Sequence, residues 1–331
     1  MSNARKLADN LPSVGQLGGR SLIINGSMEI AQRGTSSTSG GYVSLDRWYV
    51  NQSGASTTFS QETNSNPSET GGLQKYARLN VSSSSDYCHI RQPIEDVTTV
   101  PAGTATLSFY AKGTAPAGGL YVYGNQHFGS GGSSDVDWTP VLITSTLTSS
   151  WVRYTAQITV PSLDGKTVGA GSYFLLDIGQ YSNNASTAFD LNITGVMLEE
   201  GSQATPFEHE PVGVTLSKAQ RYYYSFQPAG TTIGNEVGIV CAPYGSNNFF
   251  GQVTFPVTMR ATPTLLSGGA WATRANNNNV ITSGISYQRS SPKVVLVSGT
   301  ATSISDGDAH WLEPSSGTNP NTAYMNFSAE L

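Results

Sequence analysis

Aromatic residues stand beside amide and carboxylate residues in one central segment of this 331-residue chain. The segment holds Tyr121, Tyr123, Asn125, Gln126, Asp135, Asp137 and Trp138. An aromatic ring can lie flat on the C–H face of a sugar, while amides and carboxylates pair with its hydroxyl groups. The pattern therefore predicts a sugar-binding face with Tyr121, Tyr123 and Trp138 as contacts. The alternative is that both tyrosines are ordinary strand residues and that Trp138 anchors a loop.

The last third of the chain holds a second group of the same residue types. Its members are Tyr244, Asn247, Asn248, Phe249, Phe250, Trp271, Tyr287 and Trp311. Aromatic residues beside Gly, Ser and Asn are expected to be exposed, and exposed aromatics in loops indicate binding. We expect Asn247 to Phe250, Trp271 and Trp311 to contact a receptor. A subunit interface, which is also enriched in aromatics, and a buried core are the alternatives.

The sequence gives little support for catalysis. None of the four histidines has a metal-ligand spacing, and no Gly-x-Ser-x-Gly motif occurs. Two acidic pairs, Asp135/Asp137 and Glu199/Glu200, could in principle form the carboxylate couple of a glycoside hydrolase. We expect no catalytic residues, no cofactor and no metal site, and hence a protein that is not an enzyme.

Low charge is the main feature of the composition. Charged residues make up 12% of the chain and the formal net charge is -5, which disfavours nucleic acid because that partner requires a basic surface. No apolar run approaches the roughly 20 residues that span a bilayer, and residues 1–20 lack the apolar core of a signal peptide. We expect a soluble protein made in a cytoplasm, without membrane insertion. Cys88 and Cys241 are expected to be buried thiols.

The elements that position these residues are mostly short strands. Residues 21–212 show frequent turn clusters and period-two alternation, which predict a β-sandwich. Leu107, Phe109 and Ala111 alternate in this way, and Val152, Tyr154, Ala156, Ile158 and Val160 are expected on one face of another strand. Residues 217–222 lack helix breakers, and residues 213–221 are predicted to form a short connecting helix. Residues 222–331 return to a strand pattern and predict a smaller β-sandwich. Residues 1–20 hold no core of their own and are expected to be an attachment arm, with a frayed terminus as the alternative.

Two short motifs bracket the predicted sandwich. The first is Leu22-Ile23-Ile24-Asn25-Gly26-Ser27-Met28-Glu29-Ile30-Ala31-Gln32-Arg33-Gly34, followed by Asp46-Arg47-Trp48; the second is Gly195-Val196-Met197-Leu198-Glu199-Glu200-Gly201, followed by Ala204-Thr205-Pro206-Phe207 and Gln220-Arg221-Tyr222-Tyr223. Together they resemble tail-fibre and related receptor-binding proteins of bacterial viruses, whose fold resembles a carbohydrate-binding jelly roll. The resemblance covers about two thirds of the chain. It implies that the first motif is the opening strand of the sandwich and the second its closing strand, where Glu199 and Glu200 are structural.

The resemblance also implies a role. We expect a non-catalytic virion protein, assembled in the host cytoplasm, that attaches a bacteriophage to host-surface polysaccharide. It would be a homotrimer joined to other virion proteins through its N-terminal arm. A head fibre, collar or tail connector that binds only virion proteins is the alternative, and a polysaccharide-degrading spike is a more distant one. Related jelly rolls hold a structural calcium with a residue matching Glu29, but Thr194-Gly195 stand where the closing aspartates would fall, which weakens that case.

Overall fold

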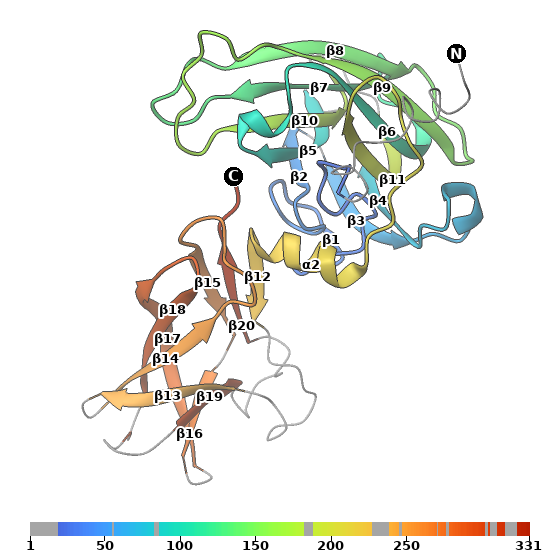
Figure 1. The fold of residues 1–331 in the computed structure, drawn as a ribbon. Coiled ribbons are helices and arrows are strands. Elements are labelled where there is room, and N and C mark those ends of the chain that lie inside the picture. Colours follow the sequence, from blue (N-terminus) through green and yellow to red (C-terminus); the bar gives the residue numbers. More distant parts are fainter. Residues whose placement is uncertain are drawn as a thin grey trace, which may run out of the picture. The chain divides into compact units, whose positions relative to one another are not determined.

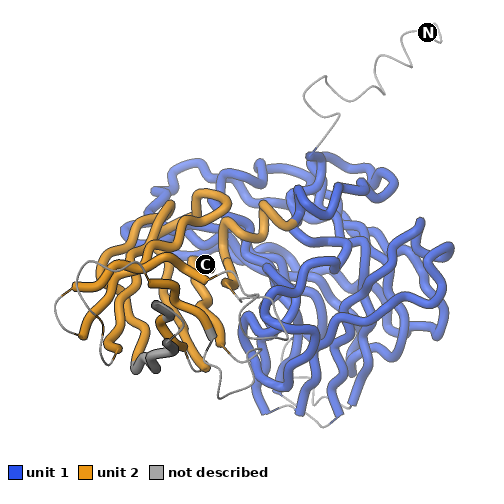
Figure 2. Tube along the Cα trace, turned by 90° about the horizontal axis from the view of Figure 1, so that it is seen from below, with its two compact units in different colours: residues 1–215, 331 blue, residues 216–330 orange. Residues whose placement is uncertain are grey.

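The chain forms two compact units in a computed structural model, one of residues 1–215 with 331 and one of residues 216–330 (Figure 2). The structure describes residues 19–54, 56–82, 86–181, 188–226, 238–244, 247–269, 271–275, 278–301, 304, 310–314 and 323–331. Residues 1–18, which hold most of the expected attachment arm, lie outside this set. Within it, no helix is long and apolar enough to cross a membrane.

The first unit is a sandwich of two antiparallel sheets (Figure 1). The six-stranded sheet has the order β1 (Ser36–Ser37), β3 (Thr57–Thr63), β4 (Lys75–Val81), β11 (Phe189–Glu200), β6 (Gly103–Thr114) and β9 (Val152–Val160). The five-stranded sheet has the order β2 (Tyr49–Ser53), β5 (Tyr87–Glu95), β10 (Tyr173–Gly179), β7 (Leu120–His127) and β8 (Val136–Thr144). Strands that are neighbours in a sheet are often distant in sequence, as in a jelly roll.

The core between these sheets is built by the alternation that the sequence showed. Trp48, Phe59, Phe109 and Phe174 are fully buried there. In β9, Ala156, Ile158 and Val160 face the core as expected, but Val152 at the start of the strand is exposed. Period two thus identified the strand correctly, and only the end that extends past the core breaks the pattern.

The two motifs that bracket the sandwich are in contact. The amide of Leu22 donates to the carbonyl of Leu198 at 2.9 Å, and the amide of Val196 donates to the carbonyl of Gly26 at 3.0 Å. A Cβ on Gly26 would lie 2.0 Å from the Val196 oxygen, so the close approach requires glycine. The expectation of a regular opening strand is wrong, however. Asn25 and Met28 have positive φ angles, which interrupt an extended conformation.

Asn25 explains why the first motif and Asp46-Arg47-Trp48 occur together. Its side-chain amide donates to the carbonyls of Ile30 and Asp46, and its oxygen accepts the Ile30 amide. The indole of Trp48 donates to the Asn25 carbonyl at 3.1 Å. The motif is therefore a buried hydrogen-bonded turn that closes one edge of the core.

The second unit contains a barrel. After helix α2 (Val212–Gln220), a three-stranded sheet has the order β12 (Tyr223–Phe226), β20 (Tyr324–Ser328) and β15 (Thr264–Gly268). The closed barrel has the order β13 (Ile239–Tyr244), β14 (Asn248–Thr254), β18 (Val294–Ala301), β17 (Asn278–Ser290), β16 (Trp271–Ala275) and β19 (His310–Pro314). The predicted all-β class is confirmed. Where we expected two packed sheets in this unit, six of its strands close on themselves, which removes the free edges of the barrel sheet.

Candidate functional site

The outer face of the five-stranded sheet carries a group of polar and aromatic side chains that could meet a ligand. In β5, Cys88 and Ile90 point into the core, so His89 and Arg91 lie on the opposite face. In β7, Val122 is in the core and Tyr123 lies on that same outer face. Because β10 pairs with both strands, its outward Asp177 lies between Arg91 and Tyr123 in the register.

A buried ion pair forms the centre of this face. The Arg91 guanidinium donates to both carboxylate oxygens of Asp177, at 2.9 and 3.1 Å. Asp177 is almost fully buried, whereas the Arg91 side chain remains partly exposed. A bidentate pair of this kind holds both side chains in one geometry. Arg91 also lies over the ring of Tyr49, which extends the fixed region to β2.

His89 connects the ion pair to the aromatic residues. Its Nε2 lies 3.0 Å from the Asn51 amide nitrogen and 2.9 Å from an Arg91 nitrogen. Because arginine can only donate, Nε2 must accept, and the ring proton therefore sits on Nδ1. That N–H donates to the Tyr123 hydroxyl at 2.6 Å, and the hydroxyl in turn donates to the Gln180 carbonyl at 2.8 Å. These two bonds hold the Tyr123 hydroxyl between β5 and the segment after β10.

Burial sets the protonation of this network. It lowers the pKa of His89 from 6.5 to about 3, with a smaller contribution from the Arg91 charge. It raises the pKa of Asp177 from 3.8 to about 7, against the opposing charge and hydrogen bonds of Arg91. It also raises the pKa of Tyr123 far above the usual range. His89 and Tyr123 are thus both neutral over the physiological range, as their hydrogen bonds require.

Three tyrosines pack together at one end of the face. The rings of Tyr121 and Tyr181 have centroids 5.4 Å apart and are tilted by 37°, and Tyr181 meets Tyr123 edge-on at 4.9 Å. Tyr181 is 37% exposed. Leu142 pairs with Tyr121 in the register and is 48% exposed. The result is an accessible apolar surface that crosses β10, β7 and β8, with a polar network beside it.

The opposite end of the same strands carries a second, smaller cluster. His127 stacks on Tyr173, with ring centroids 4.5 Å apart, and its Nδ1 lies 2.9 Å from an Asp135 oxygen. Tyr173 and Gly179 are the two ends of β10, so the clusters are separated by most of a seven-residue strand, roughly 20 Å at 3.3 Å per residue. The face is long enough to contact several units of a chain-like ligand.

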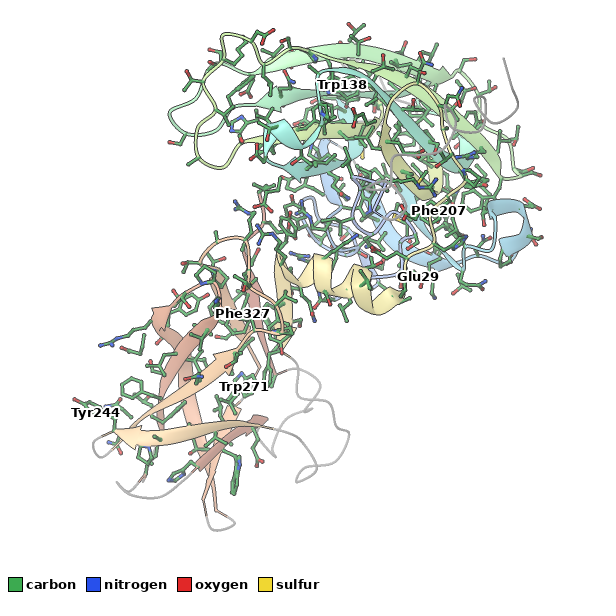
Figure 3. The ribbon with its side chains drawn as sticks, in the orientation of Figure 1. Glu29, Trp138, Phe207, Tyr244, Trp271 and Phe327 are labelled. Carbon is green, nitrogen blue, oxygen red and sulfur yellow. The ribbon has the colours of Figure 1, made fainter. Side chains whose placement is uncertain are left out.

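The structure separates the three predicted contacts of the central segment. Tyr121 and Tyr123 are neighbours on the outer face, as a sugar contact requires. Trp138 was expected beside them, but it is 2% exposed, stacks on Phe174 and donates its indole N–H to the Leu175 carbonyl (Figure 3). A register irregularity between β7 and β8 accompanies this change of side. Trp138 is a core residue and cannot contact a surface ligand.

The predicted contacts in the second unit also include both buried and exposed residues. Trp271 is 3% exposed and Phe249 is fully buried, so the expectation that they are exposed is wrong: both fill the barrel core. Trp311 is 50% exposed, and Asn247 and Asn248 are exposed as well. Phe250 is half-buried and packs against exposed Tyr244, which Figure 3 shows on the outer side of the barrel.

One member of each acidic pair is held by a neighbouring residue. Glu199 is buried and accepts hydrogen bonds from the amide and the hydroxyl of Thr205, so it fixes the segment after β11. This agrees with the structural role that the motif implied. Asp135 is held by His127, as described above. Neither pair presents two free carboxylates across an open sugar site.

The aspartate near the start of the closing strand is already paired with an arginine. Asp190, the one aspartate on β11, is held by two donors of the Arg78 guanidinium at 2.8 to 3.2 Å. In the described part of the chain, no three His, Cys, Asp or Glu residues gather as metal ligands. Cys88 and Cys241 are buried free thiols, as expected, and burial raises their pKa values to about 11 and about 12.

Comparison with known proteins gives structural likenesses only. No family model and no curated protein sequence matches the chain. A solved CBM4 structure matches with a TM-score of 0.34 at 16% identity, over 53% of this chain and 97% of that one. A family 30 carbohydrate-binding module matches with 0.35 at 14%, over 59% and 93%. The enzymatically active domain of tailspike protein 4 from bacteriophage CBA120 matches with 0.32 at 14%, over 54% and 21%. At TM-scores below 0.5, function has to be argued from the side chains themselves.

The sequence interpretation missed the residues at the centre of the face. His89 and Arg91 lie on β5, whereas Asp177 lies on β10 and Tyr181 just after it, and only the sheet order brings the two segments together. One signal was available in Tyr87 to Glu95, where polar residues alternate with Cys88, Ile90 and Ile94. That alternation marks a strand whose outward side is polar, although it does not show what lies next to it.

Proposed function

We propose that the jelly-roll unit binds an oligosaccharide across the outer face of its five-stranded sheet, without catalysis. The observation that supports this most strongly is the accessible surface of Tyr121, Tyr181 and Leu142 beside the network of His89, Arg91 and Asp177. The rings offer stacking surfaces, and the half-exposed Asn51 and Arg91 offer hydrogen-bond donors to hydroxyl groups.

The tyrosine rings of this face are already ordered before a ligand arrives, which favours binding. A tyrosine that moves freely loses side-chain entropy when a ligand orders it, by about 0.5–1.5 kcal/mol for a rotamer-rich side chain. Tyr123 is already fixed by two hydrogen bonds, and Tyr181 rests on its ring. These side chains lost their entropy when the protein folded, so a ligand does not have to order them again.

In its biological role, the chain is a virion protein, a tail fibre or other receptor-binding appendage that attaches a bacteriophage to host-surface glycans. The motif resemblance supports this role, as does a face that suits sugars. We further propose a homotrimer, joined to the particle through residues 1–20, because weak single sites become firm attachment when several act together. An appendage that binds only other virion proteins, and a polysaccharide-degrading spike, are the competing roles.

A carbohydrate microarray probed with the full-length chain tests the binding proposal. We expect the chain to bind a subset of oligosaccharides, and to bind them better than the single sugars of which they are composed, because the face is longer than one sugar. The signal from bound, fluorescently labelled protein should stay constant with time, because a protein without catalysis does not cleave the immobilised glycans. A chain that binds no glycan, or that cleaves those it binds, would contradict the proposal in favour of one of the two competing roles.

A further inference from the structure

A polar pocket of about 360 Å³ lies on the outer face of the six-stranded sheet, the other sheet of the jelly roll. Phe59 and Leu79 point into the core, so their neighbours on β3 and β4 face outward. The volume falls at the lower end of the roughly 300–1,000 Å³ of ligand pockets, which suits one small ligand. The lining residues all have polar side chains: Thr35, Ser36, Thr58, Ser60, Gln61, Glu62, Arg78 and Asn80.

Short side chains on β3 create this pocket. The register places Ser60 between Ser36 of β1 and Arg78 of β4. Thr58 pairs with Asn80 in the next row of outward residues. Because β1 has only two residues and ends the sheet, the small hydroxyl side chains lie between a short edge and the longer side chains of β4. Ser60 is 6% exposed although it faces outward, so it forms the floor of the pocket.

Hydrogen bonds hold the walls of the pocket in place. The bidentate pair with Asp190 fixes Arg78 through its Nε and one of its terminal nitrogens. The Gln61 amide donates to two carbonyls of the first motif, at 2.7 and 3.0 Å. The Ser60 hydroxyl donates to the Glu62 carboxylate at 2.7 Å. A ligand therefore meets side chains that are already ordered, which lowers the entropic cost of binding.

The lining still offers both donors and acceptors to a ligand. The second terminal nitrogen of Arg78 and one carboxylate oxygen of Glu62 have no hydrogen-bond partner in the described part of the chain. The side chains of Thr58 and Asn80 bond to no other residue there. None of the eight lining residues is aromatic, so a ligand would be held by hydrogen bonds and not by stacking.

The charges of the lining favour a neutral ligand. Arg78 and Glu62 bring one charge of each sign, and Asp190 neutralises the guanidinium. An anion in the pocket would lie near Glu62, and a cation would lie near Arg78, so each would meet a like charge. A neutral ligand rich in hydroxyl groups meets no such opposition, because each hydroxyl can donate to the carboxylate or accept from the guanidinium.

We propose that this pocket is a second carbohydrate site, which takes a single neutral sugar unit through hydrogen bonds alone. Three strands and two rows of outward residues give a footprint of roughly 10 by 7 Å, the size of one pyranose ring with its hydroxyl groups. The site lies on a different sheet from Tyr121 and Tyr181, and it does not depend on oligosaccharide binding there.

Saturation-transfer difference NMR on the full-length chain tests this site, with the methyl glycosides of glucose, galactose and mannose at millimolar concentration as probes. Thr58→Val removes a lining hydroxyl with little change of shape. Thr155→Val is its matched control, because Thr155 faces outward on β9 of the same sheet and is not among the lining residues. We expect at least one glycoside to bind, about fivefold more weakly in Thr58→Val and equally well in Thr155→Val.

Tyr121→Ala separates this site from the oligosaccharide face. Binding of the single glycoside should be unchanged in this variant, whatever happens to oligosaccharides. Weaker glycoside binding in Tyr121→Ala with unchanged binding in Thr58→Val would overturn the second site and leave the first in place. Asn80→Ala provides a second lining variant should Thr58→Val fail to fold, with the same expected loss.

Two further outcomes overturn the inference. If none of the three neutral glycosides gives a signal with the unsubstituted chain, the pocket holds only water, and the oligosaccharide proposal is unaffected. If the methyl glycoside of glucuronic acid or of glucosamine binds more tightly than the neutral probes, the ligand is an anion or a cation and the assignment of a neutral sugar is wrong.

Discussion

The two units both place aromatic rings on the outward side of a β-sheet, but they surround those rings differently. In the jelly roll, Tyr123 is tied to His89 and through it to a buried ion pair. In the barrel, Trp311 lies between Val240 and Arg274 in the register, and Tyr244 packs against Phe250. Rings held beside hydrogen-bond donors suit a hydroxylated ligand, whereas the packing of Tyr244 on Phe250 offers apolar contact alone. The neighbours of an aromatic residue therefore indicate its role better than its exposure does.

Gly26→Ala should have the largest effect and should affect the jelly roll alone. The added Cβ would lie 2.0 Å from the Val196 carbonyl oxygen, so the two motifs could no longer approach. We expect a loss of more than about 3 kcal/mol in the free energy of unfolding of this unit, as for other severe overpacking. Hydrogen exchange should show lost protection in β11 and retained protection in β14.

Gly213→Ala is the matched control for that substitution. Its Cβ would meet nothing within 4 Å and it lies in helix α2, where alanine is favoured over glycine by roughly 0.5–1 kcal/mol. Equal loss of protection in both units after Gly26→Ala would contradict the expectation that this contact stabilises the jelly roll alone.

The pH dependence of stability tests the buried network that distinguishes the jelly roll. His89 has a pKa of about 3 when folded and 6.5 as a free group, so its contribution to stability is lost as the pH falls from 6.5 towards 3. Asp177 has a pKa of about 7 when folded and 3.8 as a free group, so its contribution is lost as the pH rises from about 4 to 7. Between about pH 4 and 6.5 the two contributions change with pH in opposite directions, so their slopes cancel.

Substituting one residue at a time should make the contribution of the other to the pH dependence of stability measurable. In His89→Gln the free energy of unfolding should fall with rising pH over this window, relative to the unsubstituted chain, by up to about 1.4 kcal/mol per pH unit. In Asp177→Asn the free energy of unfolding should rise with pH by a similar amount. In the double variant it should have the same pH dependence as in the unsubstituted chain. Urea denaturation at several pH values measures this. Identical slopes in all four proteins would show that these groups are not buried together.

Local patterns in the sequence were sufficient for the strands but not for the site. Alternation located β6 and β9, whereas the first motif, which was expected to be a strand, is a turn whose Gly26 lies against β11. The side on which a residue lies could not be predicted where the register shifts, as at Trp138, or where a barrel closes around a ring, as at Trp271. His89, Arg91 and Asp177 required the sheet order itself, because 86 residues separate Arg91 from Asp177.

Isothermal titration of the full-length chain with the best oligosaccharide from the array tests the central claim most directly. Tyr121→Ala and Tyr181→Ala should each weaken binding about fivefold, or ~1 kcal/mol per stacking ring. Tyr244→Ala is the matched control, since Tyr244 is exposed but lies on the barrel, and a single soluble oligosaccharide is insensitive to avidity. We predict that the control binds as tightly as the unsubstituted chain. Weakened binding in Tyr244→Ala with unchanged binding in Tyr121→Ala and Tyr181→Ala would contradict the account.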